Sequence, residues 1–133
     1  MTLKLSSLKT DASKEDDGDW IPAVAMPGVS FKVRSPQFGP FKTARDLLIQ
    51  KLSRRRRAGD DGYSDKVDRE VGKLYAEHIL LDWKGLDEPY SKELALEVCT
   101  DRGYRRTVFA AIQACADEVG ISELEYIEDV AKN

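Results

Sequence analysis

The stretch HILLDWKGLDEPYSKE, residues 78–93, runs from an apolar helical pattern into a turn that carries a tryptophan, and then into a new helix start. A large ring in a tight turn buries much apolar area at a small cost in side-chain entropy, and Gly85 gives the backbone beside it freedom. We therefore interpret Trp83 as a core residue that fixes the connection between two helices. An exposed Trp83 would instead be an anchor in a protein interface.

Helical periodicity appears on both sides of this turn. Apolar residues recur at helical spacing in several segments, and Ser64 and Ser91 are suitable N-cap residues. The predicted helices cover residues 40–57, residues 64–81, a segment that begins at Ser91, residues 108–119, and a short segment that begins with a capping box at Ser122. Each apolar stripe is too narrow to be stable in water alone, so the helices must pack together.

Ahead of these helices the sequence predicts a β-hairpin. Residues 20–24 and 29–34 flank Met26-Pro27-Gly28, and the second run alternates apolar and polar side chains. Pro22 has no N–H for a ladder, so we expect the first strand at a sheet edge. Two strands are marginal in isolation, so the hairpin must pack on the helices or on a neighbouring subunit. Residues 1–19 are polar, and we expect a flexible tail there.

The composition fits one soluble domain, since 34% of the 133 residues are charged and 41% are hydrophobic. We predict a mainly α (α+β) fold: a small helical bundle of four to five helices with an N-terminal β-hairpin. Residues 1–19 are then the tail and residues 20–133 a single domain, with the hairpin in 20–35 and the bundle in 40–133. No apolar run can span a bilayer and no secretory signal follows Met1, so we expect a cytoplasmic location and no membrane partner.

Residues with possible chemistry are few. His78 is the only histidine, and Asp82 lies one turn later, so a base or metal ligand is conceivable. With no second histidine, and neither Cys99 nor Cys115 nearby in the sequence, we interpret His78 as structural. The two cysteines are interpreted as reduced, buried thiols. Without a phosphate loop, a nucleophile elbow or metal-ligand spacing, we expect no enzymatic activity, no cofactor and no metal.

Charge is unevenly distributed along the chain. The net charge of −3 argues against a surface built entirely for nucleic acid. Residues 39–57 hold seven basic residues and one acid, whereas residues 117–133 hold six acids and one lysine. Residues 11–19 hold five acids and one lysine. Such separated signs favour docking between copies of the chain or with a partner.

Four adjacent arginines, residues 54–57, form the most basic feature. Their guanidinium groups could neutralise phosphates in a salt-sensitive way. Cations at a helix C-terminus also complement the helix dipole, so the position has an explanation without nucleic acid. Neither aromatic interleaving nor a recognition-helix motif accompanies the block. We therefore favour a protein partner or a helix-end role over nucleic acid.

A resemblance to a known family rests on the Asp-Trp-Lys-Gly turn at residues 82–85, which is followed by Pro89, Tyr90 and a helix start. This stretch resembles the "DWKG" turn of the tail assembly chaperones and related small tail proteins of long, flexible-tailed bacteriophages. The likeness spans roughly residues 3–119 and includes three further segments: residues 18–21, 29–35 and 41–57.

The resemblance implies a virus-encoded, non-catalytic factor made in the cytoplasm of the infected bacterial host. Such a chaperone coats the long tape-measure protein and brings tail-tube subunits to it during tail assembly. Family members are mainly helical and self-associate, which implies a homo-oligomer, and many relatives also occur in a longer, frameshifted form. No catalytic or cofactor-binding residues carry over. The family signature carries over to Asp82, Trp83, Lys84, Gly85, Pro89 and Tyr90.

We place a partner-binding surface, as a hypothesis, on the amphipathic segment before residue 58. It is formed by an apolar stripe and the arginine block: Leu47, Leu48, Leu52, Arg54, Arg55, Arg56 and Arg57. The acidic residues from Asp117 onward are a candidate electrostatic counterpart. Two alternatives stand beside the chaperone function. One is a structural minor tail protein retained in the virion, and the other is a small DNA-binding regulator that uses residues 54–57.

Overall fold

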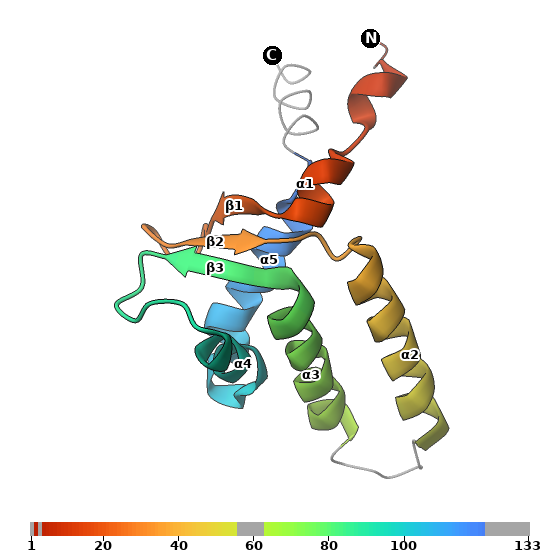
Figure 1. Cartoon of the computed structure of the whole chain (residues 1–133), viewed down its shortest axis with the longest axis vertical. Coiled ribbons are helices and arrows are strands. Elements are labelled where there is room, and N and C mark those ends of the chain that lie inside the picture. Colours follow the sequence, from red (N-terminus) through yellow and green to blue (C-terminus); the bar gives the residue numbers. More distant parts are fainter. Residues whose placement is uncertain (1, 3, 56–62, 122–133) are drawn as a thin grey trace.

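The computed structural model describes residues 2, 4–55 and 63–121, without the side chain of Arg55. Helices and one small antiparallel sheet make up this part of the chain (Figure 1), which confirms the predicted mainly α, α+β class. The strands are β1 (Asp19–Pro22), β2 (Ser30–Val33) and β3 (Leu80–Lys84). The α-helices are α1 (Ala12–Asp17), α2 (Gly39–Arg55), α3 (Tyr63–Leu74), α4 (Lys92–Thr100) and α5 (Ala110–Glu118). Shorter helical turns are η1 (Leu5–Leu8), η2 (Tyr75–Ile79), η3 (Arg102–Tyr104) and η4 (Arg105–Phe109).

Three of the predicted helices are confirmed, with small changes in their bounds. The helix expected over residues 40–57 is α2, and the helix expected over residues 108–119 is formed by η4 and α5 together. The helix expected to begin at Ser91 is α4, and the Ser91 hydroxyl accepts a hydrogen bond of 3.0 Å from the Leu94 amide. The short helix expected from Ser122 lies outside the described residues.

The helix predicted over residues 64–81 ends earlier than expected. It consists of α3 and η2, and the next five residues form the third strand, β3, instead of a helix end and a turn. In β3, Trp83 pairs with Phe31 of β2, and a bulge follows Lys32. The cause is tertiary, because pairing with β2 satisfies the backbone of this segment and buries Leu80 and Trp83. Helical periodicity in the local sequence does not encode that pairing.

The sheet has the order β1-β2-β3, with antiparallel neighbours. β1 and β2 form the predicted hairpin, and Pro22 lies on an edge strand as expected. One row of side chains across the sheet, Ile21, Phe31 and Trp83, packs into the hydrophobic core. α5 lies against β1 and β2 (Figure 1), so the hairpin packs on a helix of its own chain.

Contacts between aromatic rings connect α2, η2 and η4 within the core. The ring of Tyr75 in η2 lies edge-on to Phe41 of α2, with 5.0 Å between the ring centres, and edge-on to Phe109 of η4, at 5.3 Å. Burial raises the pKa of the Tyr75 hydroxyl, which keeps it protonated at neutral pH. α2 packs beside α3 at the margin of the molecule (Figure 1), so much of its length faces solvent.

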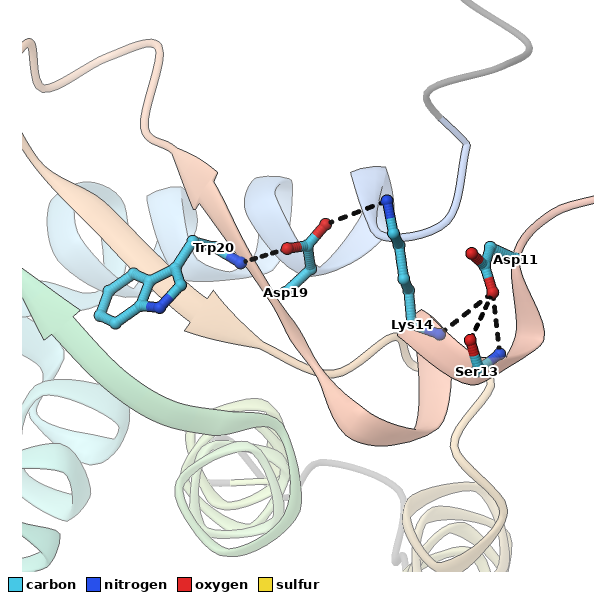
Figure 2. A network of polar contacts seen from close by, with 5 residues as sticks. All are labelled: Asp11, Ser13, Lys14, Asp19 and Trp20. Atoms are coloured by element: carbon cyan, nitrogen blue, oxygen red, sulfur yellow. Dashed lines mark hydrogen bonds and ion pairs between the residues drawn. The ribbon is translucent and has the colours of Figure 1, made fainter.

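α1 is a short helix that the sequence analysis did not predict. Figure 2 shows how it begins and how it is joined to the sheet. The Asp11 carboxylate accepts hydrogen bonds from the amides of Ser13 and Lys14, at 3.1 and 3.3 Å. The Lys14 ammonium lies 3.8 Å from a carboxylate oxygen of Asp19, and the other oxygen of Asp19 accepts the Trp20 amide at 2.9 Å. These contacts connect the helix cap with the first strand.

Backbone contacts also hold α1 against distant parts of the chain. The Asp11 amide donates to the Gly120 carbonyl just after α5, at 3.0 Å, and the Ser35 amide after β2 donates to the Glu15 carbonyl, at 3.0 Å. Residues 12–17 therefore form a helix inside the segment expected to be a tail. The domain boundary placed after residue 19 stays a prediction.

Replacing Gly72 by alanine is expected to destabilise the protein, although alanine normally favours a helix interior by about 1 kcal/mol. A Cβ at this position of α3 would lie 1.9 Å from the Cys99 carbonyl oxygen of α4, so the two helices would have to separate. We expect a loss of about 2 kcal/mol or more in the free energy of unfolding, measured by urea titration. Gly39→Ala is the matched control, because a Cβ there meets no atom within 4 Å. Equal midpoints for the two variants would contradict the close approach.

The hydrogen bonds that cap α1 are expected to weaken at acid pH. The hydrogen bond from the Ser13 side chain, followed by that from the Lys14 amide, lowers the pKa of the Asp11 carboxyl. A lowered pKa means that the cap stabilises α1 above the ordinary pKa of aspartate and loses that effect as the pH falls through the lower folded value. Amide chemical shifts of Ser13 and Lys14 will follow this titration. Asp11→Asn keeps an acceptor that does not titrate, so its shifts should stay nearly constant.

Candidate functional site

The signature turn, Asp82 to Gly85 with Pro89 and Tyr90, is formed by the end of β3, which contains Asp82, Trp83 and Lys84, and by the loop before α4. Trp83 is buried at its centre, as predicted, and its indole N–H donates to the Glu88 carbonyl at 2.8 Å. The Tyr90 ring meets the indole edge-on, with 5.2 Å between the ring centres. The indole therefore closes the loop upon itself and fills the core below it. This is the role of a structural staple.

The other signature residues support the same turn. The Asp82 carboxylate accepts the backbone N–H of Trp83 at 2.8 Å, and the Lys84 ammonium lies 4.5 Å above the Trp20 ring. Gly85 has a φ of +94°, and a Cβ there would lie 2.1 Å from the Gly28 carbonyl oxygen of the hairpin loop. Only glycine permits both this backbone conformation and this close approach. Pro89 is exposed.

Tyr90 ties the end of the signature turn to β3. Its hydroxyl lies 3.4 Å from the Leu80 carbonyl oxygen, at the long end of hydrogen bonding. Burial, followed by the negative charge of Asp82, raises the pKa of this hydroxyl. The side chain thus remains a neutral donor at physiological pH.

The His78 side chain is largely shielded from solvent by its neighbours. Its side chain is 21% exposed, 3.9 Å from the Glu77 carboxylate, and its ring centre is 6.5 Å from that of Phe38. The Asp82 carboxylate, one turn later in the sequence, accepts a hydrogen bond from the Trp83 amide. Within residues 2, 4–55 and 63–121, no cluster of three histidine, cysteine or acidic side chains could hold a metal ion. The absence of catalysis stays an expectation.

Both cysteine side chains are buried, as predicted, and neither is in a disulfide. Burial raises the pKa of the Cys99 thiol to about 12 and that of the Cys115 thiol to about 11. The second shift also includes repulsion from the Glu118 charge. Thiols with such pKa values carry almost no thiolate at neutral pH, so they pack as small apolar groups.

The three leucines of the predicted apolar stripe on α2 differ in their exposure to solvent. Leu47 is 62% exposed, Leu48 is half-buried, and Leu52 is only 4% exposed. Leu52 therefore packs within the protein, and only the Leu47 side of the stripe faces solvent. Ile49, which sequence reasoning assigned to no face, is 50% exposed. In the sequence it directly follows Leu47 and Leu48, and nothing there marks it as exposed.

Two basic side chains lie beside the exposed Leu47. Lys51 and Arg54 are exposed on the same helix, whereas the guanidinium of the half-buried Arg45 lies 3.7 Å from the Asp46 carboxylate and 5.8 Å from the centre of the Phe41 ring. Arg54 and Leu47 are seven residues apart and so lie on the same side of α2. The described part of the chain does not include Arg56, Arg57 or the side chain of Arg55. It also ends before the acidic residues that follow Ile121.

Comparisons with known proteins give one family. The sequence profile of the family described as YdaY prophage protein matches residues 35–133. The match includes α2, α3, β3, α4 and α5, and it leaves out α1 and the hairpin. No curated protein and no solved structure matches the chain significantly. Among the helices of the described residues, none combines the length and apolar character needed to cross a membrane.

Substitutions of Trp83 test whether the signature turn is a staple. Trp83→Ala should lower the free energy of unfolding by about 3–5 kcal/mol, because it empties a buried site. Trp83→Phe should cost about 1–2 kcal/mol, since it leaves the Glu88 carbonyl without its donor. Trp20→Phe, on the half-buried outer row of the sheet, is the matched control and should cost less than about 1 kcal/mol. Urea unfolding measures all three, and a stable Trp83→Ala protein would contradict the staple.

Proposed function

The chain belongs to the YdaY prophage protein family, and from this premise we propose that it is a bacteriophage tail assembly chaperone. In this role it binds the tape-measure protein, brings tail-tube subunits to it during tail assembly, and catalyses no reaction. It acts in the cytoplasm of the infected bacterial host. The family match supports the phage origin, and the resemblance of the signature turn supports the part in tail assembly.

The outer side of α2 is the observation that carries this proposal. We define the client surface as three exposed residues on one side of this helix: Leu47, Lys51 and Arg54. Single exposed apolar side chains are common in monomeric proteins and need no explanation. Here the exposed Leu47 lies beside two cations on a helix that packs mainly on one side against α3 and η2. A bound polypeptide would cover Leu47 and gain its apolar area.

The charge of the client surface indicates the chemistry of its partner. Lys51 and Arg54 are cationic, and the sequence of residues 39–55 contains a single acidic residue, Asp46. A helix with apolar anchors and acidic flanks would therefore dock more favourably than a basic one. We propose that segments of this kind in the tape-measure protein are the clients. If the chaperone binds these segments before the tail tube forms around them, the segments cannot bind one another.

The exposed Arg54 supports one rival function, that of a small DNA-binding regulator. Phosphate binding by this residue and its basic neighbours would give measurable affinity for duplex DNA, falling steeply with salt. The proposed chaperone has no such affinity. Filter binding at two salt concentrations separates the two functions, because a steep salt slope with tight binding would favour the regulator.

Binding to the purified tape-measure protein of the same prophage tests the proposed function. We expect the double variant Leu47→Ser with Arg54→Glu to weaken this binding at least about tenfold, because it removes an apolar anchor and reverses a charge. Calorimetric titration gives the dissociation constants, and circular dichroism verifies that the variant is folded.

The matched control makes the same kind of change on another helix. Lys92 and Leu96 are exposed on α4, so Leu96→Ser with Lys92→Glu makes the same leucine replacement and a charge reversal away from the client surface. It should bind the tape-measure protein as the wild type does. If the wild type fails to bind, the chaperone function is wrong. If the wild type binds and both double variants bind equally well, the client surface lies elsewhere.

A further inference from the structure

An apolar groove lies between the hairpin loop and the helix formed by η4 and α5. Its volume is about 440 Å³. Val24 and Met26 of the loop form one wall, and Ala110 and Ala114 of α5 form part of the floor. Val24 is 89% exposed and both alanines are exposed. The groove is therefore open to another polypeptide.

Opposite charges mark the two ends of this groove. Arg106 lines it near the start of the helix, and Glu118 lines it at the end of α5. Among the residues that the structure describes, neither side chain has an ion pair or hydrogen bond, whereas the neighbouring Arg105 lies 3.1 Å from Asp65 of α3. Arg106 and Glu118 are thus available for charges from outside.

Four of the lining residues recur at a spacing of four along the helix: Arg106, Ala110, Ala114 and Glu118. Residues at this spacing form a ridge, and ridges of this kind interdigitate in the commonest class of helix packing. Small side chains in the middle let two backbones approach closely, as at Gly72 in the core. The ridge is positive at one end and negative at the other, so it complements a reversed copy of itself.

We propose that this groove binds the same groove of a second copy of the chain and forms a two-fold symmetric dimer. An axis that passes between Ala110 and Ala114 brings Arg106 of each protomer to Glu118 of the other, so the ion pair forms twice. The exposed Val24 side chains are covered at the same time. No residue of this contact belongs to the client surface on α2, so the dimer goes beyond the proposed function and does not rest on it.

Sedimentation equilibrium with two charge reversals tests the dimer. The wild type should show a mass that rises with concentration from monomer to dimer. Arg106→Glu and Glu118→Arg each replace both ion pairs by like-charge pairs, so each variant alone should dimerise at least about tenfold more weakly. An equimolar mixture of the two variants restores opposite charges at both contacts. It should therefore dimerise at least about tenfold more tightly than either variant alone.

Arg102→Glu is the matched control, because Arg102 is exposed but does not line the groove. This variant should dimerise as the wild type does, and circular dichroism should give the same helix content for every variant. A wild type that sediments as a monomer at every concentration overturns the proposal. Dimerisation that neither charge reversal weakens, or a mixture that associates no better than its components, overturns it as well.

Discussion

The burial of Phe31 at the centre of the sheet is the constraint on which the rest of the structure depends. Its side chain is fully buried between Ile21 of β1 and Trp83 of β3, so β2 needs one partner from its own hairpin and one from a distant part of the chain. The family match begins at Ser35, and so it contains β3 but neither of the strands that complete the sheet. The N-terminal hairpin therefore closes a surface that the matched segment would otherwise leave open to water.

That constraint explains the shape of the neighbouring segments. The chain must leave the helical conformation after Ile79 to pair with β2, and after Lys84 it must reverse direction in the short space before α4. Gly85 and the indole of Trp83 make this reversal possible, one by its backbone and the other by closing the loop. On the inner face α5 covers β1 and β2, which places its buried Cys115 against the backbone of β1.

Local signals predicted the helices α2 and α4 and the hairpin, because periodicity, capping and alternation depend on neighbouring residues. β3 could not be predicted in this way, since Ile79 to Leu81 continues a helical apolar pattern and only pairing with β2 decides against it. α1 was missed because its residues are mostly polar, although Asp11 as a cap and Gly18 with positive φ mark its ends. In the candidate site, periodicity placed Leu47 and Leu52 on one face. It could not tell which part of that face α3 covers.

Two Asp-Trp pairs stand on the two edge strands, one in β1 and one in β3. In each pair the carboxylate holds the N–H of the following tryptophan, at 2.9 Å for Trp20 and 2.8 Å for Trp83. Edge strands otherwise offer free amide groups to any extended chain, which is the first step toward fibrils. The carboxylates occupy those donors and add a negative charge to each border. This arrangement disfavours lateral pairing of the sheet with another extended chain.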